Sequence, residues 1–317
     1  MRTKTISISL AALALAGCST TPLPEDFSGK ATYDIVRKIR CEARDAVRSK
    51  AVALMLANTK LTKTYATGKA LQEGRRSFSE LKYSDLDPET IESVKVYEGT
   101  TIGYQFDFDI KETNDNSSKL NLTGPIGVNV FSMELSAGGK LSRQNKRTFA
   151  AADKFRDLAM NMGERYCQGL ADGANAVYPI TGDIGIMEIV DTFINLNQSG
   201  GLTSLKDKNF KEMTDTRTFN TDMSFGLTPK LEISSKGSRV KDTSFTSSNV
   251  RNDQHQVAIA LALPVEAAAP SPGPKKKATK KTSSDATTQR VFEMLDEQNV
   301  REGYYILRDL KTKVDQR

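Results

Sequence analysis

The spacing of apolar residues changes along this chain, and the first regular stretch has the spacing of a helix. From about residue 32 to residue 57, apolar side chains recur mostly three and four positions apart, which predicts an amphipathic helix. The other side of this helix is basic, with Arg37, Lys38, Arg40, Arg44 and Arg48. A basic amphipathic helix can lie on anionic lipid headgroups. Because Glu42 and Asp45 interrupt the charge, we favour a helix that packs on a core and keeps a solvated basic face.

The period then changes to that of a strand. In residues 102–111 the even positions are apolar and the odd positions are mostly polar, which is the pattern of a strand buried on one face. The segments predicted after it are a turn at 114–118, a strand region at 119–135 with a bend near Gly124-Pro125, an end at Gly138-Gly139 and a returning strand at 141–149.

Two more helices and a second group of strands follow. Helical spacing predicts helices at 149–170 and from Asp183 to about Asn197. The candidate strands after them are at 218–225, 229–234, 244–250 and 256–263. Similar short sequences in the two β regions, Leu122-Thr123-Gly124-Pro125 and Leu227-Thr228-Pro229, suggest a diverged repeat. The predicted fold class is α+β, with antiparallel β regions packed against several helices.

The C-terminal part has the composition of a linker followed by helices. Residues 264–285 are rich in Pro, Ala, Ser and Lys, which predicts a linker. Residues 287–299 and 304–314 then have the pattern of two short helices around Gly303. Short isolated helices are marginal in water, so their apolar faces need a cover. The two helices could pack on each other, on the preceding body or on a partner.

A short apolar run near the first residue ends at a cysteine. Ile6–Ala16 follows Arg2 and Lys4 and is too short to span a bilayer, which takes about 20 apolar residues in a helix. A basic start, a short apolar run and small residues before a junction describe a secretory signal peptide. With Leu15-Ala16-Gly17-Cys18 at the junction, the segment resembles the lipobox of bacterial lipoproteins.

The resemblance to a lipobox implies that Cys18 becomes the mature N-terminus and carries a lipid that attaches the protein to a membrane. In Gram-negative envelopes the residue after the cysteine helps to sort lipoproteins, and Ser19 favours the outer membrane, facing the periplasm. An ordinary signal peptide with a chance cysteine is the alternative. The predicted layout is a signal peptide at 1–17, a lipidated tether at 18–31, a body at 32–263, the linker at 264–285 and a C-terminal helical segment at 286–317.

The positive charge of the chain is concentrated in the linker. The full chain carries +6, and loss of Arg2 and Lys4 with the signal peptide leaves +4. Five linker residues supply more than all of this charge: Lys275, Lys276, Lys277, Lys280 and Lys281. The rest of the mature chain sums to −1, so no nucleic-acid partner is predicted. The lysine run is a weak candidate for binding polyanions such as lipid phosphates, with a soluble spacer as the alternative.

Two further cysteines, Cys41 and Cys167, lie in the predicted body. An exported protein enters an oxidising compartment, where a disulfide between them is permitted. Two separately buried thiols are the alternative, since free cysteine is often a small core residue. Cys41 lies off the apolar face of its predicted helix, which slightly favours the disulfide.

Catalytic and metal-binding patterns are scarce. The single histidine, His255, argues against a zinc site built from several histidines. His255 and Asp253 could serve a distant serine, but there is no Gly-x-Ser-x-Gly motif, so we prefer a buried structural histidine. Asp107 and Asp109 share a strand face and could hold a cation, although a solvated face explains them better. We therefore expect no cofactor, no metal site and no enzymatic activity.

These patterns lead to three functional hypotheses. The first is a non-enzymatic outer-membrane lipoprotein that faces the periplasm and binds an unidentified envelope protein. The second is an oligomeric β-rich pore or export component, with strands such as 102–111 in the membrane and Asp107, Asp109 and Lys111 toward a lumen. The third is a hydrolase that no motif reveals, with His255 as the residue to test.

Overall fold

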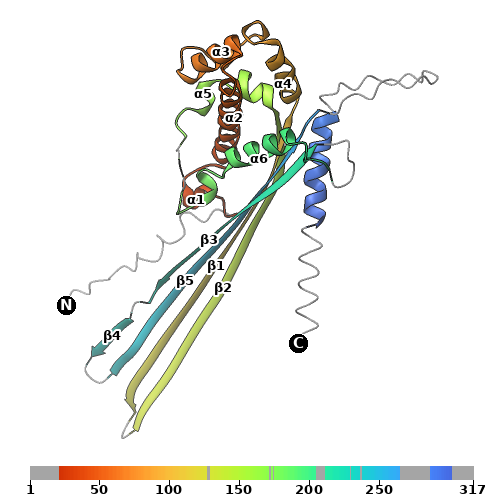
Figure 1. Cartoon of the computed structure of the whole chain (residues 1–317). Coiled ribbons are helices and arrows are strands. Elements are labelled where there is room, and N and C mark those ends of the chain that lie inside the picture. Colours follow the sequence, from red (N-terminus) through yellow and green to blue (C-terminus); the bar gives the residue numbers. More distant parts are fainter. Residues whose placement is uncertain are drawn as a thin grey trace. The chain divides into compact units, whose positions relative to one another are not determined.

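The chain folds into helices and an antiparallel sheet, which confirms the predicted α+β class (Figure 1). The computed structural model describes residues 21–126, 129–170, 173, 175–204, 211–228, 230–235, 238–264 and 286–301. Five strands form the sheet, in the order β2-β1-β5-β3, and β4 pairs with β5.

The strands of the sheet are unusually long. Their bounds are β1 (Thr101–Ile126), β2 (Asn129–Lys154), β3 (Glu212–Leu227), β4 (Lys230–Ser235) and β5 (Ser238–Ala262). β1 and β2 have 26 residues each, which is about 85 Å at ~3.3 Å per residue, whereas most strands in globular proteins have roughly 3–10 residues. β4 runs antiparallel to β5, from Lys230 opposite Ser244 to Ser235 opposite Ser238.

The longest helix, α2, was predicted correctly from its apolar spacing. The helices and short helical turns are α1 (Glu25–Ser28), α2 (Thr32–Leu56), α3 (Thr62–Gln72), η1 (Phe78–Glu80), η2 (Tyr83–Asp85), α4 (Pro88–Glu98), η3 (Asp157–Asn161), α5 (Glu164–Cys167), η4 (Pro179–Thr181) and α6 (Ile186–Gln198). Residues 286–301 form a further helix, in agreement with the first of the two predicted C-terminal helices. The second predicted helix, 304–314, lies outside the described residues.

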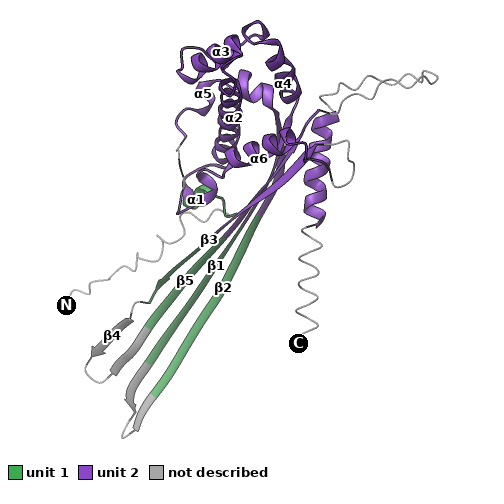
Figure 2. Cartoon of the chain, viewed as in Figure 1, with its two compact units in different colours: residues 1–27, 110–145, 222–252 green, residues 28–109, 146–221, 253–317 purple. Residues whose placement is uncertain are grey.

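The chain divides into two compact units, each built from several stretches of sequence (Figure 2). Unit 1 comprises residues 1–27, 110–145 and 222–252, and unit 2 comprises residues 28–109, 146–221 and 253–317. β1, β2, β3 and β5 each contribute residues to both units. The stretch predicted as one body, 32–263, is thus shared between two units whose segments alternate along the chain.

The core of unit 2 lies between helices and one face of its strands. Ile39 of α2, Phe193 of α6 and Phe106 of β1 are fully buried in one apolar cluster. The ring of Phe106 stacks on Phe149 of β2 with the ring centroids 5.1 Å apart. β5 adds Val257, Ile259 and Leu261. The alternating side chains of these strands therefore pack one face against α2 and α6.

Helix 286–301 packs on the other face of β5 in unit 2. Its residues Val291, Met294 and Leu295 form a buried cluster with Ala258, Ala260 and Ala262. Arg290 pairs with Glu212 of β3, with Nη2 and Oε1 2.7 Å apart. The sequence left three packing partners open for the first C-terminal helix: the second helix, the body or another protein. The helix packs on the body of its own chain.

Three local predictions between residues 110 and 170 were wrong, and in each case strand pairing overrides a local signal. The polar run at 114–118 and the glycines at 138–139 continue as strand in β1 and β2. Ser118 donates a hydrogen bond to the carbonyl of Ala137 across these strands. The first part of the predicted helix at 149–170 is strand, because β2 runs to Lys154 and its Phe149 stacks on Phe106 of β1. Helices α3 and α4 were not predicted.

Candidate functional site

The candidate functional site is the part of the sheet that belongs to unit 1, which we call the β extension. It comprises residues 110–126, 129–145, 222–227, 230–235 and 238–252. Ile110 is buried, but within 111–121, 132–145, 222–227 and 244–252 no side chain is. A sheet in a globular domain normally buries at least one face. A long sheet with both faces exposed therefore calls for a further partner.

Ion pairs between neighbouring strands show which side chains share a face of the β extension. Glu112 of β1 pairs with Arg143 of β2, with the nearest nitrogen and oxygen 2.7 Å apart. Glu112 also pairs with Arg251 of β5 at 3.0 Å. The three side chains therefore lie on one face, and we call them the rim cluster.

Contacts between β5 and β3 show which side chains of β3 lie on the face of the rim cluster. Arg251 and Asn252 are neighbours in β5, so their side chains lie on opposite faces. Asn252 donates a hydrogen bond to Asp222 of β3 at 2.6 Å, which places Asp222 on the face opposite the rim cluster. Its neighbour Met223 then lies on the face of the rim cluster.

Among the side chains that the structure describes in the β extension, the exposed large apolar ones all lie on the face of the rim cluster. They stand at even spacing from Arg143, Arg251 or Met223 and are Met133, Leu135, Leu141, Phe225, Leu227 and Phe245. Leu141 is 69% exposed and Phe225 is 61% exposed. We call this side of the sheet the apolar face.

Charge is absent from most of the apolar face. In the described side chains of the β extension, the only charged residues on this face are the three of the rim cluster. The central strands add uncharged polar residues, and Ser247 donates a hydrogen bond to Asn116 at 2.7 Å. The opposite face is polar, with Lys111, Asp115, Lys119, Glu134, Lys140 and Asp222 among its residues. The sheet is therefore amphipathic although both of its faces are exposed.

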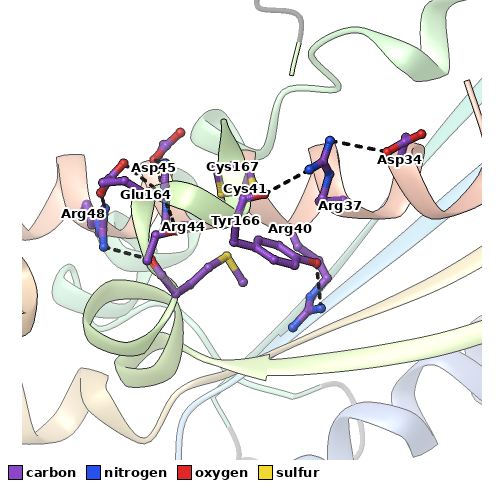
Figure 3. The surroundings of a disulfide bond; sticks show 12 residues. Asp34, Arg37, Arg40, Cys41, Arg44, Asp45, Arg48, Glu164, Tyr166 and Cys167 are labelled. Carbon is purple, nitrogen blue, oxygen red and sulfur yellow. Dashed lines mark hydrogen bonds and ion pairs between the residues drawn. A yellow bond between two sulfur atoms is a disulfide. The ribbon is translucent and has the colours of Figure 1, made fainter. Parts of the chain in front are cut away.

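The disulfide between Cys41 and Cys167 is formed, with the two Cα atoms 5.7 Å apart (Figure 3). It joins α2 to the last residue of α5 across 126 positions of sequence. This is the pairing that the sequence allowed, and it lies within unit 2.

The basic side of α2 makes its contacts within unit 2. Arg40 donates two hydrogen bonds to the carboxylate of Asp153, at 2.8 and 2.6 Å. These hydrogen bonds are the main reason that the pKa of Arg40 is raised above its ordinary value. Arg44 and Arg48 both pair with Glu164, which lies beside the disulfide in Figure 3. The expected packing of α2 on the core is confirmed, but the expected solvated basic face is wrong, because Lys38 and Arg44 are buried.

His255 lies in a closed cluster of unit 2. The hydroxyl oxygen of Tyr178 is 2.5 Å from His255 Nε2 and donates a hydrogen bond to Asp253 Oδ2 at 2.7 Å. The ring of Phe108 packs edge-on against His255 with the centroids 5.1 Å apart. Tyr178, Asp253 and His255 are each 1% exposed, which supports the structural interpretation of His255.

Residues 102–109 do not fit the hypothesis that the strand at 102–111 lies in a membrane. Ile102, Tyr104 and Phe106 are buried in the core of unit 2, so placing this segment in a membrane is wrong. Asp107 accepts hydrogen bonds from Gln105 at 3.1 Å and from Thr148 at 2.5 Å. The part of β1 that follows Asp109 belongs to the β extension instead.

Two groups of residues singled out from the sequence lie outside the part of the chain that the structure describes. Cys18 and the linker lysines Lys275, Lys276, Lys277, Lys280 and Lys281 lie outside the described residues. Across the described ranges, no group of three or more His, Cys, Asp or Glu is placed to hold a metal ion. Among the helices of those ranges, none has both the length and the apolar character that crossing a membrane requires.

Sequence reasoning missed the apolar face and the rim cluster. The available signal was the alternation of apolar residues at 133, 135 and 141 with polar residues between them, and again at 223, 225 and 227. The glycines at 138–139 were interpreted as the end of a strand, which hid the first of these patterns.

Comparison with known proteins gives a family. A family model described as "Uncharacterised protein y4kA" matches residues 21–313. A protein with the same description from Sinorhizobium fredii (strain NBRC 101917 / NGR234) is 31% identical over 263 residues, which cover 80% of this chain and 81% of that protein.

Solved structures give a much weaker likeness. The InvG secretin domain of the Salmonella SPI-1 injectisome aligns over 64% of this chain and 71% of its own, with 8% identity and a TM-score of 0.20. InvG from residue 176 to its end, in the open gate state, aligns over 58% of this chain and 68% of its own, with 8% identity and a TM-score of 0.15. TM-scores this low carry no argument about the present chain.

Proposed function

The chain belongs to the y4kA family, and we propose that it is an outer-membrane lipoprotein whose β extension forms part of an oligomeric pore. In this proposal the lipid on Cys18 attaches the protein to the membrane from the periplasmic side, and the protein has no catalytic role. Several copies supply β extensions that together enclose a passage through the membrane.

The observation that carries the proposal is the amphipathic character of the β extension. Among the described side chains, its apolar face is free of charge beyond the rim cluster, and its opposite face carries lysine and carboxylate side chains. Membrane-spanning strands alternate in this way, with apolar residues toward lipid and polar residues toward a water-filled interior. In water, the exposed apolar surface of Leu141 and Phe225 would be unfavourable, whereas lipid would cover it.

The length of the β extension fits a bilayer. From Asn129 to Arg143, β2 spans about 46 Å at ~3.3 Å per residue. A tilt of about 40°, typical of membrane strands, leaves roughly 35 Å along the bilayer normal, and the hydrocarbon core is about 30 Å thick. The strands beyond the rim cluster are therefore long enough to cross, with the rim cluster outside the hydrocarbon.

Crossing the bilayer in this form requires more than one copy. In hydrocarbon every backbone polar group needs a partner, and each group left without one costs several kcal/mol. The strand order ends at β2 and at β3, and the sheet is only about four strands wide, whereas the smallest closed cylinders have roughly eight. Pairing of β2 in one copy with the β3 side of the next would satisfy both edges.

The proposal is tested by purifying the full-length protein from membranes in detergent. Native mass measures its assembly, and planar bilayers measure its conductance. We expect an oligomer that conducts ions. A monomer without conductance, or a Cys18→Ser variant that is a water-soluble monomer, would contradict the pore.

A matched pair of variants tests the two faces. Leu135→Asp puts a carboxylate on the apolar face, where it would meet lipid, and should abolish most of the assembled, conducting form. Ser136→Asp, one position along on the opposite face, should assemble as the wild type does and alter only ion selectivity. Equal loss of assembly in the two variants would count against the assignment of the faces.

A further inference from the structure

Two backbone carbonyls near the N-terminus are held by side chains of the β extension. Arg251 Nη2 donates a hydrogen bond to the carbonyl of Leu23 at 2.7 Å. Asn145 Nδ2 donates to the carbonyl of Pro22 at 2.9 Å. All four residues belong to unit 1. These contacts join sequence positions that are 123 and 228 residues apart.

Ion pairs within the rim cluster hold the Arg251 side chain that contacts the N-terminal segment. Its Nη1 pairs with Glu112 at 3.0 Å, and Glu112 is held from its other side by Arg143. The side chains of Arg251 and Glu112 are 11% and 16% exposed. Hydrogen bonds from an ionised donor are stronger than neutral ones, so the guanidinium binds the Leu23 carbonyl firmly and from a defined position.

The N-terminal segment is itself ordered by local contacts. Pro22 and Pro24 fix two backbone angles, which lowers the entropy that binding costs. The N–H group of Leu23 donates to Asp26 Oδ2 at 2.7 Å, so both polar backbone groups of Leu23 are bonded.

We propose that these contacts are a latch that ties the lipidated N-terminus to the rim cluster of the membrane-inserted sheet. The inference rests on the proposed function. Cys18 precedes Pro22 by four residues, a distance of at most about 14 Å for extended chain. The lipid therefore enters the bilayer beside the rim cluster, where charge on the apolar face ends, and the rim cluster marks the membrane surface.

The latch has a physical consequence for insertion. Because the latch keeps the lipid within a short distance of the apolar face, insertion of the β extension becomes an intramolecular event at high effective concentration. A lipid on a long free tether would hold the β extension at the membrane much less efficiently.

The test uses a nitroxide on a single introduced cysteine, Thr21→Cys, in the full-length protein reconstituted in phosphatidylglycerol-containing vesicles. Residues Cys41 and Cys167 are in a disulfide and the thiol of Cys18 carries the lipid, so the label has one site. We expect an immobilised spectrum and a depth at the boundary of lipid and water. Asn145→Ala should make the label partly mobile, and Asn145→Ala combined with Arg251→Ala should convert most of the signal to a mobile one. Asn145→Ala removes no ion pair, so its fold is expected to persist.

Asn252→Ala is the matched control, because Asn252 bonds to Asp222 on the opposite face of the sheet, and the label at residue 21 should stay immobilised in this variant. A label that is as immobile in the double variant Asn145→Ala/Arg251→Ala as in the wild type overturns the latch. A second label at Leu135→Cys separates this result from failure of the proposed function. Lipid contact at 135 with a mobile label at 21 in the wild type overturns the latch alone, whereas water contact at 135 overturns the membrane insertion on which it rests.

Discussion

Gly103 of β1 lies directly against Val291 of helix 286–301. A Cβ atom added to Gly103 would stand 2.1 Å from Val291 Cγ1 and 3.2 Å from Leu295 Cδ1, so the absence of a side chain permits the contact. Gly103→Ala should displace the helix from the sheet and lower the stability of unit 2 by about 1–3 kcal/mol, as overpacked cores do. Hydrogen exchange of residues 286–301 should become faster.

Gly139→Ala is the control for this prediction, since a Cβ atom at Gly139 meets nothing within 4 Å. Its exchange pattern should match the wild type. Unchanged protection of residues 286–301 in Gly103→Ala would show that the helix does not depend on this close approach.

The disulfide should contribute much of the stability of unit 2. In the chain-entropy model, closing a loop of 126 residues stabilises the folded state by roughly 4–5 kcal/mol. The double variant Cys41→Ser/Cys167→Ser should therefore unfold at a much lower urea concentration, measured by far-ultraviolet circular dichroism. Cys18→Ser alone should leave the midpoint unchanged, and a double variant as stable as the wild type would show that the bond adds nothing.

The Arg40–Asp153 pair should matter more than an exposed ion pair. Arg40→Ala leaves the Asp153 carboxylate, whose side chain is 9% exposed, without its bidentate partner. We expect a loss of about 2–3 kcal/mol in the free energy of unfolding. Arg75→Ala, which breaks the exposed pair with Glu73, should change it by less than about 1 kcal/mol. If the two variants lose similar free energy of unfolding, the Arg40–Asp153 pair matters no more than an exposed ion pair.

The stability of unit 2 should depend on pH through Glu164. Burial raises the pKa of Glu164, but Arg48 and Arg44 outweigh it, so the pKa is lowered from its ordinary value of 4.5. A lowered carboxyl pKa stabilises the folded state above the unfolded-state pKa, and this contribution is lost as pH falls through the folded-state pKa. Glu164→Gln should therefore be less stable than the wild type at neutral pH, and the difference should shrink below pH 4.5. A difference that is constant with pH would contradict this origin.

Local spacing predicted those parts of the fold that are decided locally. The apolar residues of α2 and the alternation at 102–110 correspond to faces that are buried in unit 2. The helix predicted at 149–170 failed because Phe149 also suits a strand, and its pairing with Phe106 depends on a residue 43 positions away. Such pairing cannot be deduced from the spacing of one segment.

The candidate site was harder to predict than the core. A run such as Asn114–Ser118 is typical of a turn, and only its pairing with β2 and β5 shows that it is a strand. The rim cluster joins Glu112, Arg143 and Arg251, which are far apart in sequence and carry no motif. The disulfide was easier to predict, because the body has only two cysteines and they can pair in only one way.

The central claim, that the β extension crosses a membrane with its apolar face toward lipid, is tested most directly by nitroxide scanning of residues 132–142 of β2 in vesicles. Each single-cysteine variant is exposed to oxygen, which concentrates in lipid, and to a water-soluble nickel complex. We predict a period of two: labels at 133, 135 and 141 collide mainly with oxygen, and labels at 132, 134, 136 and 140 collide mainly with nickel. Nickel access that is equally high at all of these positions would contradict the account.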